Sequence, residues 1–344
     1  MLNLLTEQLR GRTDLSSEQV IDAVEQMTSE EILPEVKAEF LTALAAKGES
    51  TEELAAFAGE LRARATTVPL DDATRAGTIL DVCGTGGDGL NTFNISTTVS
   101  ILCAAAGVTV AKHGNRAITS RSGSADVLAA LGIPTDLSPA AAAASMAAHD
   151  FAFLFAPLYH PAFKNIAPAR KLCAEAGKRT LFNFLGPLLN PARPTAQLIG
   201  VPRAELTVPM AKVLQTLGIQ RGMVVCGSVG GKPMDELSTL GENSIAEFYQ
   251  DRGFATSTLS PADFQLSDAT LEDLAGGDAE TNAGLIRSIL NGEDKGPKRE
   301  AVLLNTGAAL FVANAADSIS AGMDLAAAVI DDGRAADKLA ALAN

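Results

Sequence analysis

The 344-residue sequence contains no tryptophan, two tyrosines and four cysteines. The cysteines, Cys83, Cys103, Cys173 and Cys226, form no CxxC pair and have no histidine nearby at ligand spacing. This scarcity disfavours both a disulfide framework and a zinc site. We therefore expect four reduced thiols and a cytoplasmic location.

Long apolar runs and excess positive charge are also missing. The longest apolar run, residues 101–111, is far shorter than the roughly 20 residues that span a bilayer. The first nine residues carry no basic segment, so we expect neither a signal peptide nor membrane residence. With 41 acidic and 27 basic residues the formal charge is −14. This balance argues against nucleic acid as a partner, because that affinity depends on Lys and Arg neutralising phosphates.

One segment departs from the acidic balance. Between Asp88 and Asp126 there is no Asp or Glu, whereas Lys112, His113, Arg116 and Arg121 all lie there. The run Gly84-Thr85-Gly86-Gly87-Asp88-Gly89 precedes it. Glycines let backbone N–H groups approach an anion closely, and the N-terminus of a following helix adds partial positive charge. The segment therefore predicts a site for a small, highly charged anion.

Apolar periodicity divides the chain into a helical beginning and an α/β remainder. Residues 1–70 carry apolar side chains at helical spacing, with a capping box at Ser50 and Glu53. From residue 78 short apolar runs alternate with helical segments, which is typical of a mostly parallel sheet with helices on both faces. Strands are expected at 79–83, 108–111, 151–155, 198–201 and 223–226, and helices at 96–106, 126–131 and 300–344.

Residues 157–195 interrupt the α/β pattern, because they are rich in Pro, Arg and Asn. We place this segment against the N-terminal helices. The expected fold is a small helical domain, residues 1–70 with 157–195, and a larger α/β domain, residues 71–156 with 196–344. The larger domain would hold the anion.

The spacing Gly84-x-Gly86-x-x-Gly89 matches the dinucleotide fingerprint. A dinucleotide site, however, needs an acid at the end of the second strand to hold the ribose hydroxyls, and Lys112-His113 stands there instead. No Lys-Ser/Thr follows the last glycine, which disfavours a Walker-type loop. Asn94-Ile95-Ser96-Thr97 begins the next helix, where such residues cap the backbone and also offer donors to phosphate.

The ordered motifs resemble those of the anthranilate phosphoribosyltransferase family. The matching runs are Gly84–Gly89, Asn91–Thr97, Lys112–Arg116, Ser122–Asp126, His160–Ala162, Phe182-Asn183, Gly186–Pro191 and Asp235-Glu236. They span roughly residues 80–240 in the order that the family shows. The resemblance implies transfer of 5-phosphoribose from phosphoribosyl pyrophosphate to the amine of anthranilate, with release of pyrophosphate, in tryptophan biosynthesis.

The resemblance also implies the residues of the site. Phosphoribosyl pyrophosphate would be bound by Gly84, Thr85, Gly86, Gly87, Asp88, Thr92, Asn94, Ser96, Thr97, Lys112 and Ser124. Anthranilate would be bound by Gly84, His113, Asn115, His160, Arg170, Gly186 and Pro187. Ser96, Asp235 and Glu236 would hold Mg²⁺, with two ions per monomer, and the helical domain would form a homodimer.

Several alternatives remain open from the sequence. Arg179 competes with Arg170 for the anthranilate carboxylate, because Lys171–Lys178 makes the spacing between the two arginines longer than the family usually has. The role of Asp88 is ambiguous. No nucleophile set is recognisable, so the rate would arise from alignment and electrostatics. The competing functions are a pyrimidine nucleoside phosphorylase, which uses inorganic phosphate, and a non-catalytic relative that binds nucleic acid.

Overall fold

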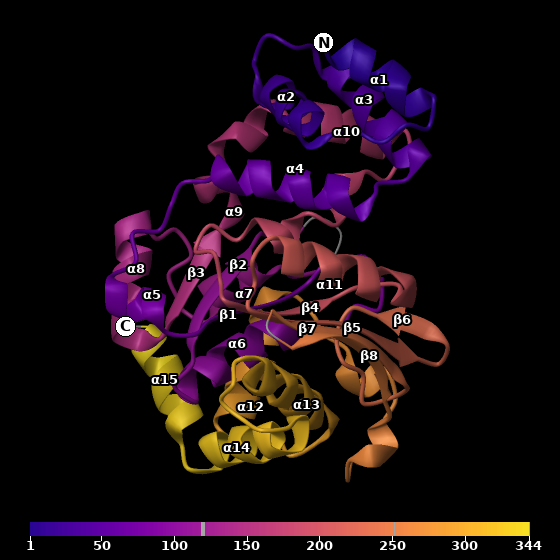
Figure 1. The fold of residues 1–344 in the computed structure, drawn as a ribbon. Coiled ribbons are helices and arrows are strands. Elements are labelled where there is room, and N and C mark those ends of the chain that lie inside the picture. The colour runs from indigo at the N-terminus through magenta and orange to yellow at the C-terminus, as the bar shows by residue number, and fades with distance from the viewer. Residues whose placement is uncertain (118–120, 251, 344) are drawn as a thin grey trace.

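A helical lobe lies over one face of an α/β lobe in the computed structural model, which describes residues 1–117, 121–250 and 252–343 (Figure 1). The helical lobe is formed by α1 (Leu2–Arg10), α2 (Ser17–Thr28), α3 (Pro34–Lys47), α4 (Thr51–Ala63) and α10 (Ala167–Glu175). The expected capping box begins α4: Glu53 N–H donates to Ser50 Oγ at 3.1 Å, and Ser50 N–H donates to Glu53 Oε2 at 2.8 Å.

The α/β lobe is built on one sheet in the order β3-β2-β1-β4-β5-β7-β8, with β6 beside β5. Its strands are β1 (Ile79–Gly84), β2 (Thr109–Gly114), β3 (Phe151–Phe155), β4 (Ala196–Gly200), β5 (Arg221–Val229), β6 (Lys232–Met234), β7 (Asn243–Tyr249) and β8 (Gly253–Leu259). The first five pair in parallel, and β6, β7 and β8 are antiparallel additions. The expected mostly parallel sheet is confirmed.

One expected strand needs correction, and the sequence did not predict the strands β6, β7 and β8. The strand expected at 108–111 runs over Thr109–Gly114, so Lys112 and His113 lie within it and are buried. The sequence did not predict the antiparallel hairpin of β7 and β8, because exposed Thr and Ser alternate through β8 without a strong apolar signal. The short strand β6, which forms a hairpin with β5 just before Asp235, is a further addition.

Helices cover both faces of the sheet. The remaining helices are α5 (Asp72–Ala76), α6 (Ile95–Ala105), α7 (Ser124–Ala130), α8 (Pro139–His149), α9 (Ala156–Tyr159), α11 (Thr207–Thr216), α12 (Ala279–Leu290), α13 (Pro297–Val312), α14 (Ile319–Asp331) and α15 (Arg334–Leu342). Short 3₁₀ turns occupy η1 (Pro161–Asn165), η2 (Leu181–Asn183), η3 (Gly186–Leu189), η4 (Ala204–Leu206), η5 (Pro261–Asp263) and η6 (Glu272–Leu274). The helical C-terminal region expected at 300–344 is confirmed as α13, α14 and α15, the last of which ends at Leu342, and Asn344 lies outside the described residues.

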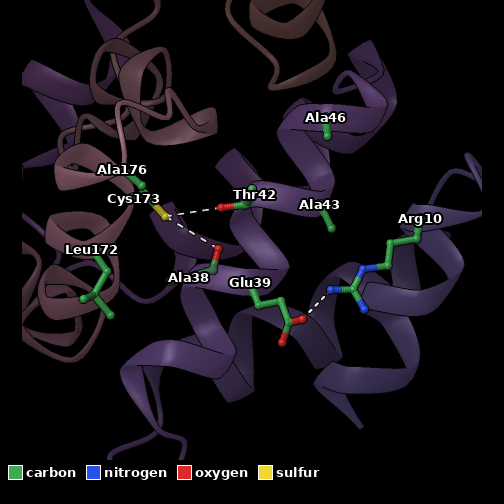
Figure 2. Close-up of a pocket in the computed structure, with 9 residues that line it drawn as sticks. All are labelled: Arg10, Ala38, Glu39, Thr42, Ala43, Ala46, Leu172, Cys173 and Ala176. Atoms are coloured by element: carbon green, nitrogen blue, oxygen red, sulfur yellow. Dashed lines mark hydrogen bonds and ion pairs between the residues drawn. The ribbon is translucent and has the colours of Figure 1, made fainter.

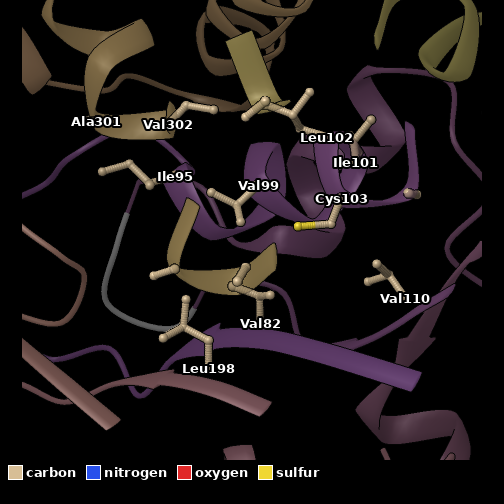
Figure 3. Close-up of a cluster of buried hydrophobic side chains, with 14 of the residues drawn as sticks. Val82, Ile95, Val99, Ile101, Leu102, Cys103, Val110, Leu198, Ala301 and Val302 are labelled. Atoms are coloured by element: carbon tan, nitrogen blue, oxygen red, sulfur yellow. The ribbon is translucent and has the colours of Figure 1, made fainter. Parts of the chain in front are cut away.

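Alternation along the strands separates the apolar cores on the two faces of the sheet, because successive side chains point to opposite faces. Val82 and Leu198 face α6 and α13 in the first core, which Figure 3 shows. Ile199 and Val224 face the other way, toward a core that also contains α11 and the helical lobe. One apolar cluster therefore joins the helical lobe to the sheet.

The segment between β3 and β4 leaves the α/β lobe and packs against the first helices. Cys173 Sγ of α10 lies 3.6 Å from Ala38 O of α3. The buried Lys37 ammonium donates to the carbonyls of Ser29 at 2.7 Å and Asn165 at 2.8 Å. Within the described residues, no helix combines the length and apolarity needed to cross a membrane.

Candidate active site

The glycine-rich loop after β1 encloses the carboxylate of Asp235. Gly86 N–H donates to Asp235 Oδ2 at 2.6 Å. A Cβ on Gly84 would lie 2.3 Å from Asp235 Oδ2, and a Cβ on Gly200 would lie 1.6 Å from Asp235 O. Only glycine permits this approach at the ends of β1 and β4. The backbone around Asp235 therefore packs directly against the ends of β1 and β4.

Three acidic side chains meet at this loop. Asp88 accepts hydrogen bonds from the N–H groups of Leu90, at 3.1 Å, and Asp235, at 3.4 Å. Removal from water, followed by the charges of Asp88 and Glu236, raises the pKa of Asp235 well above its ordinary value. Desolvation also raises the pKa of Glu236 to about 7, against the opposing effect of Lys112. The ambiguous Asp88 thus belongs to the acidic cluster and closes the loop onto Asp235.

Lys112 places a buried ammonium beside the start of α6. Its Nζ donates to Val82 O at 2.8 Å and to Ser96 Oγ at 3.4 Å. Ser96 N–H in turn donates to Glu236 Oε1 at 3.2 Å. Burial lowers the pKa of Lys112, whereas the neighbouring Asp81 and Glu236 oppose that shift. Lys112, Ser96 and Glu236 are therefore gathered as the motifs implied.

A second group of expected residues lies around the loops before α6 and α7. Asn94 donates to Ser122 O at 3.2 Å and accepts from Asn282 Nδ2 at 2.8 Å. Ser124 Oγ donates to Asn115 O at 3.3 Å. A β-bridge between Thr92 and Ala275 ties this region to the segment before α12. These contacts hold the predicted phosphate loops together.

The other expected residues differ in how open they are. Thr85, beside the loop's exposed glycines Gly86 and Gly87, donates to Gly86 O at 3.3 Å. Thr97 is only 1% exposed within α6. Asn115 is exposed, and its Oδ1 accepts from Arg116 N–H at 2.8 Å. The side chain of Thr97 is therefore less exposed to solvent than those of Thr85 and Asn115.

His113 and His160 form a buried pair on the opposite face from Lys112. Their ring centroids are 5.2 Å apart in an edge-to-face arrangement. The rings hydrogen-bond the backbone at Gly186 and Leu189 respectively, and both Nε2 atoms are buried without a partner among the described residues. Burial lowers the pKa of His113 to about 3 and that of His160 to about 4. Both imidazoles are therefore neutral at pH 7.

An aromatic row continues from the histidine pair to Arg170. Phe163 stacks 5.2 Å from His160, and Phe182 lies 5.7 Å from Phe163. The Arg170 guanidinium lies 5.1 Å from the Phe182 ring centroid. Burial lowers the pKa of Arg170, and no carboxylate forms an ion pair with it within the ranges that the structure describes. Arg179, by contrast, is exposed.

Sequence reasoning missed two polar residues that support the site. Asp81 on β1 is fully buried and hydrogen-bonds Gln197 Nε2 at 3.1 Å. Burial raises the pKa of Asp81 to about 6. Gln197 also donates to Pro187 O at 2.6 Å, which connects the sheet to η3. Polar residues inside apolar strands were the available signal, because a buried polar group needs a partner.

The expected metal ligands are brought together in the acidic cluster. Among the described residues, no three or more His, Cys, Asp and Glu side chains are placed to hold a metal by themselves.

A separate pocket of about 380 Å³ lies in the helical lobe between α1, α3 and α10 (Figure 2). Its lining includes Arg10, Glu39 and Cys173, and it contains none of the expected site residues.

Comparisons with known proteins extend over nearly the whole chain. "Glycosyl transferase family, a/b domain" matches residues 76–336, and "Glycosyl transferase family, helical bundle domain" matches residues 3–65. The chain is 43% identical over 339 residues to an anthranilate phosphoribosyltransferase of Alkaliphilus metalliredigens, covering 98% of this chain and 96% of that protein.

Solved structures agree with the sequence relatives. The Thermus thermophilus anthranilate phosphoribosyltransferase has a TM-score of 0.89 and 39% identity, with 98% of each chain covered. The Saccharomyces cerevisiae enzyme, solved in complex with PRPP and Mg, has a TM-score of 0.86 and 28% identity, covering 98% of this chain and 96% of that one. The chain therefore belongs to the anthranilate phosphoribosyltransferase family of glycosyltransferases.

Proposed function

We infer that this chain transfers the 5-phosphoribosyl group from phosphoribosyl pyrophosphate to the amine of anthranilate, giving N-(5-phosphoribosyl)anthranilate and pyrophosphate. Family membership supports this reaction and its place in tryptophan biosynthesis. One observation carries the assignment of roles: Lys112 joins an acidic, glycine-lined cluster, while its neighbour His113 joins an aromatic row ending at Arg170. Two chemically different groups of side chains thus meet at one strand.

The donor side would bind phosphates through the glycine-rich loop and the start of α6. Exposed backbone at Gly86 and Gly87 suits close approach to an anion, as does the helix N-terminus at Asn94 and Ser96. The Lys112 ammonium adds a positive charge within reach of Ser96. Thr85, Asp88, Thr92, Thr97 and Ser124, with Gly84, complete the proposed set around the same loops.

The acidic cluster fits Mg²⁺. Asp235 and Glu236 are desolvated near Asp88 and have raised pKa values, an arrangement that a divalent cation relieves. We propose that Asp235, Glu236 and Ser96 hold the metal, with two ions per monomer. When bound, Mg²⁺ would neutralise charge on the pyrophosphate leaving group. The Gly86 N–H group donates to Oδ2 of Asp235 and the Ser96 N–H group to Oε1 of Glu236, which orients both carboxylates.

The acceptor side suits a planar aromatic acid. His113 and His160 offer neutral rings, and Gly186 and Pro187 shape the adjoining turn. Arg170 supplies a desolvated guanidinium without a carboxylate of its own, and such a group pairs well with the anthranilate carboxylate. Asn115 would contribute from the end of β2. The exposure of Arg179 supports Arg170 as the partner.

The chemistry needs no protein nucleophile. The acceptor amine is neutral at pH 7, so its lone pair is available without a strong base. We propose displacement at the ribose anomeric carbon, in which the C–N bond forms as the bond to pyrophosphate breaks, and the amine nitrogen then gives up one proton to pyrophosphate or to water. Lys112 and the backbone donors would stabilise the departing negative charge, and the acceptor pocket would align the amine.

The deciding experiment follows the loss of anthranilate fluorescence with phosphoribosyl pyrophosphate and Mg²⁺, with and without chelator. Magnesium-dependent consumption of anthranilate is expected. Phosphorolysis of thymidine or uridine without anthranilate turnover would instead favour a nucleoside phosphorylase. Binding of nucleic acid with no turnover of either kind would favour the non-catalytic alternative.

We also propose a homodimer formed through the helical lobe. Leu4 on α1 and Leu33 just before α3 are large apolar side chains that are 75% and 65% exposed, and a dimer contact would remove them from water. A pocket lined mostly by apolar side chains lies in the same lobe, between α1, α3 and α10. We further propose the division into two domains, residues 1–70 with 157–195 and residues 71–156 with 196–344, supported by the packing of α10 on α3.

Four free cysteines among the described residues support a reducing, cytoplasmic location.

A further inference from the structure

A buried asparagine on α13 makes both backbone hydrogen bonds of Leu237, the residue after the acidic pair. Leu237 N–H donates to Asn305 Oδ1 at 2.9 Å, and Asn305 Nδ2 donates to Leu237 O at 2.9 Å. The second hydrogen of Nδ2 is used by Ala301 O, also at 2.9 Å. The amide thus acts as a peptide group would in a neighbouring strand, although it is 68 residues away in sequence.

Packing alone does not account for this asparagine. Asn305 is 1% exposed, and its helical neighbours Ala301, Leu304 and Ala309 are fully buried apolar residues. A polar amide in such surroundings lowers stability unless its hydrogen bonds are made. Both Nδ2 hydrogens and the Oδ1 oxygen of Asn305 make hydrogen bonds, so the amide fixes the backbone at Leu237.

That segment carries the proposed metal ligands. Gly227 N–H donates to Glu236 O at 3.1 Å from one side, while Gly200 leaves room for the Asp235 carbonyl. With Leu237 held by Asn305, the backbone of residues 235–237 is fixed on both sides. The Asp235 carboxylate then points to Gly86 and the Glu236 carboxylate to Ser96.

We propose that Asn305 is a positioning residue for magnesium binding, acting through the Leu237 backbone on Asp235 and Glu236. This inference rests on the proposed function. Supporting groups that orient metal ligands typically change metal affinity or activity by roughly 10–100-fold when removed. Asn305 hydrogen-bonds Leu237 and Ala301 and is not among the proposed substrate-binding residues, so its effect should fall on magnesium and on the magnesium-dependent donor.

The test measures phosphoribosyl pyrophosphate binding by calorimetry across a magnesium titration, in the full chain. Asn305→Ala should raise the half-saturating magnesium concentration about 10–100-fold and leave the Michaelis constant for anthranilate within about two-fold. Leu310→Ala is the matched control, because it also removes a fully buried side chain from α13. It should lower the melting temperature without changing the magnesium requirement.

Asn305→Asp adds a rescue test. Its carboxyl, when protonated, can accept from Leu237 N–H and donate to Leu237 O, but the ionised form cannot donate. Relative to wild type at the same pH, its magnesium defect should be smaller at pH 5.5 than at pH 8. If Asn305→Ala does not fold, this comparison of the two pH values tests the positioning role of Asn305.

Two results would overturn the inference. One is a wild-type magnesium requirement in the folded Asn305 variants, and the other is an equal shift in Leu310→Ala. A wild-type chain that binds the donor with magnesium but does not consume anthranilate would instead contradict the proposed function. In that case the calorimetric binding data would still test the role of Asn305 in magnesium binding.

Discussion

Lys112 and His113 are neighbours on β2 whose side chains serve opposite faces of the sheet. Lys112 Nζ reaches Ser96 Oγ, 3.4 Å away on α6, whereas the His113 ring meets His160 with centroids 5.2 Å apart. The two-residue period of a strand dictates this divergence. It places the phosphate side and the aromatic side of the proposed site one residue apart, which suits a transfer between two bound substrates.

The buried histidines predict loss of stability in acid. Their folded pKa values, about 3 for His113 and about 4 for His160, lie below the unfolded value of 6.5. As the pH falls below about 6.5, the unfolded chain binds protons that the folded chain does not, so stability decreases. Between pH 7.5 and pH 5 the loss should be about 2 kcal/mol per histidine.

Urea unfolding at the two pH values measures this effect. His160→Gln should reduce the difference between the two free energies of unfolding. His149→Gln is the matched control, since His149 lies outside the pair, and it should preserve the difference. Equal pH dependence in His160→Gln and wild type would contradict the assignment of a neutral, buried His160.

The acidic cluster predicts opposite changes in stability and activity. Asp235→Asn with Glu236→Gln should lower the turnover rate on the order of 10²–10³-fold. In the absence of magnesium, the same variant should have a higher melting temperature at pH 8. The raised pKa values mean that the charged forms destabilise the folded state above the ordinary carboxyl pKa, and neutral amides remove that effect.

The control for the acidic cluster is Glu30→Gln with Glu31→Gln, an adjacent and exposed acid pair in the helical lobe. This control variant should change neither the turnover rate nor the melting temperature appreciably. A wild-type response to magnesium in the Asp235 and Glu236 variant would show that the pair does not hold the metal.

Arg170→Ala should weaken the use of anthranilate selectively. A charge-assisted hydrogen bond is worth about 1.5–3 kcal/mol, which corresponds to roughly ten- to a hundred-fold in the Michaelis constant. The value for phosphoribosyl pyrophosphate should change much less. Arg179→Ala is the control, because Arg179 is exposed. Steady-state kinetics with each substrate varied would identify Arg179 as the partner if the selective defect appeared there instead.

Gly200→Ala should disrupt the segment that carries the acids. The new Cβ would lie 1.6 Å from Asp235 O, so the backbone must move. Overpacking of this kind costs about 1–3 kcal/mol of stability, and displacement of Asp235 should also lower the rate. Gly284→Ala on α12 meets open space and should stabilise the chain by up to about 1 kcal/mol. Thermal melting and turnover of both variants test the contrast, and normal turnover in Gly200→Ala would contradict it.

Local sequence determined much of this protein. The capping box at Ser50, the strands around residues 79–84 and 151–155, and the glycine-rich loop follow from spacing and residue type, because capping, strand periodicity and close backbone approach act over a few residues. The ordered motifs also identified the family. The hairpin of β7 and β8 was missed, since its exposed strand has a weak local signal.

Only the tertiary structure decided how these parts act on one another. Arg170 and Arg179 are equally charged in sequence, but one lies partly buried against Phe182 and the other lies exposed. In sequence, Asn305 is a polar residue within the mostly apolar part of α13, and only folding brings it to Leu237. Burial, pKa and hydrogen-bond partners depend on segments far apart in the chain, and a local pattern therefore does not specify them.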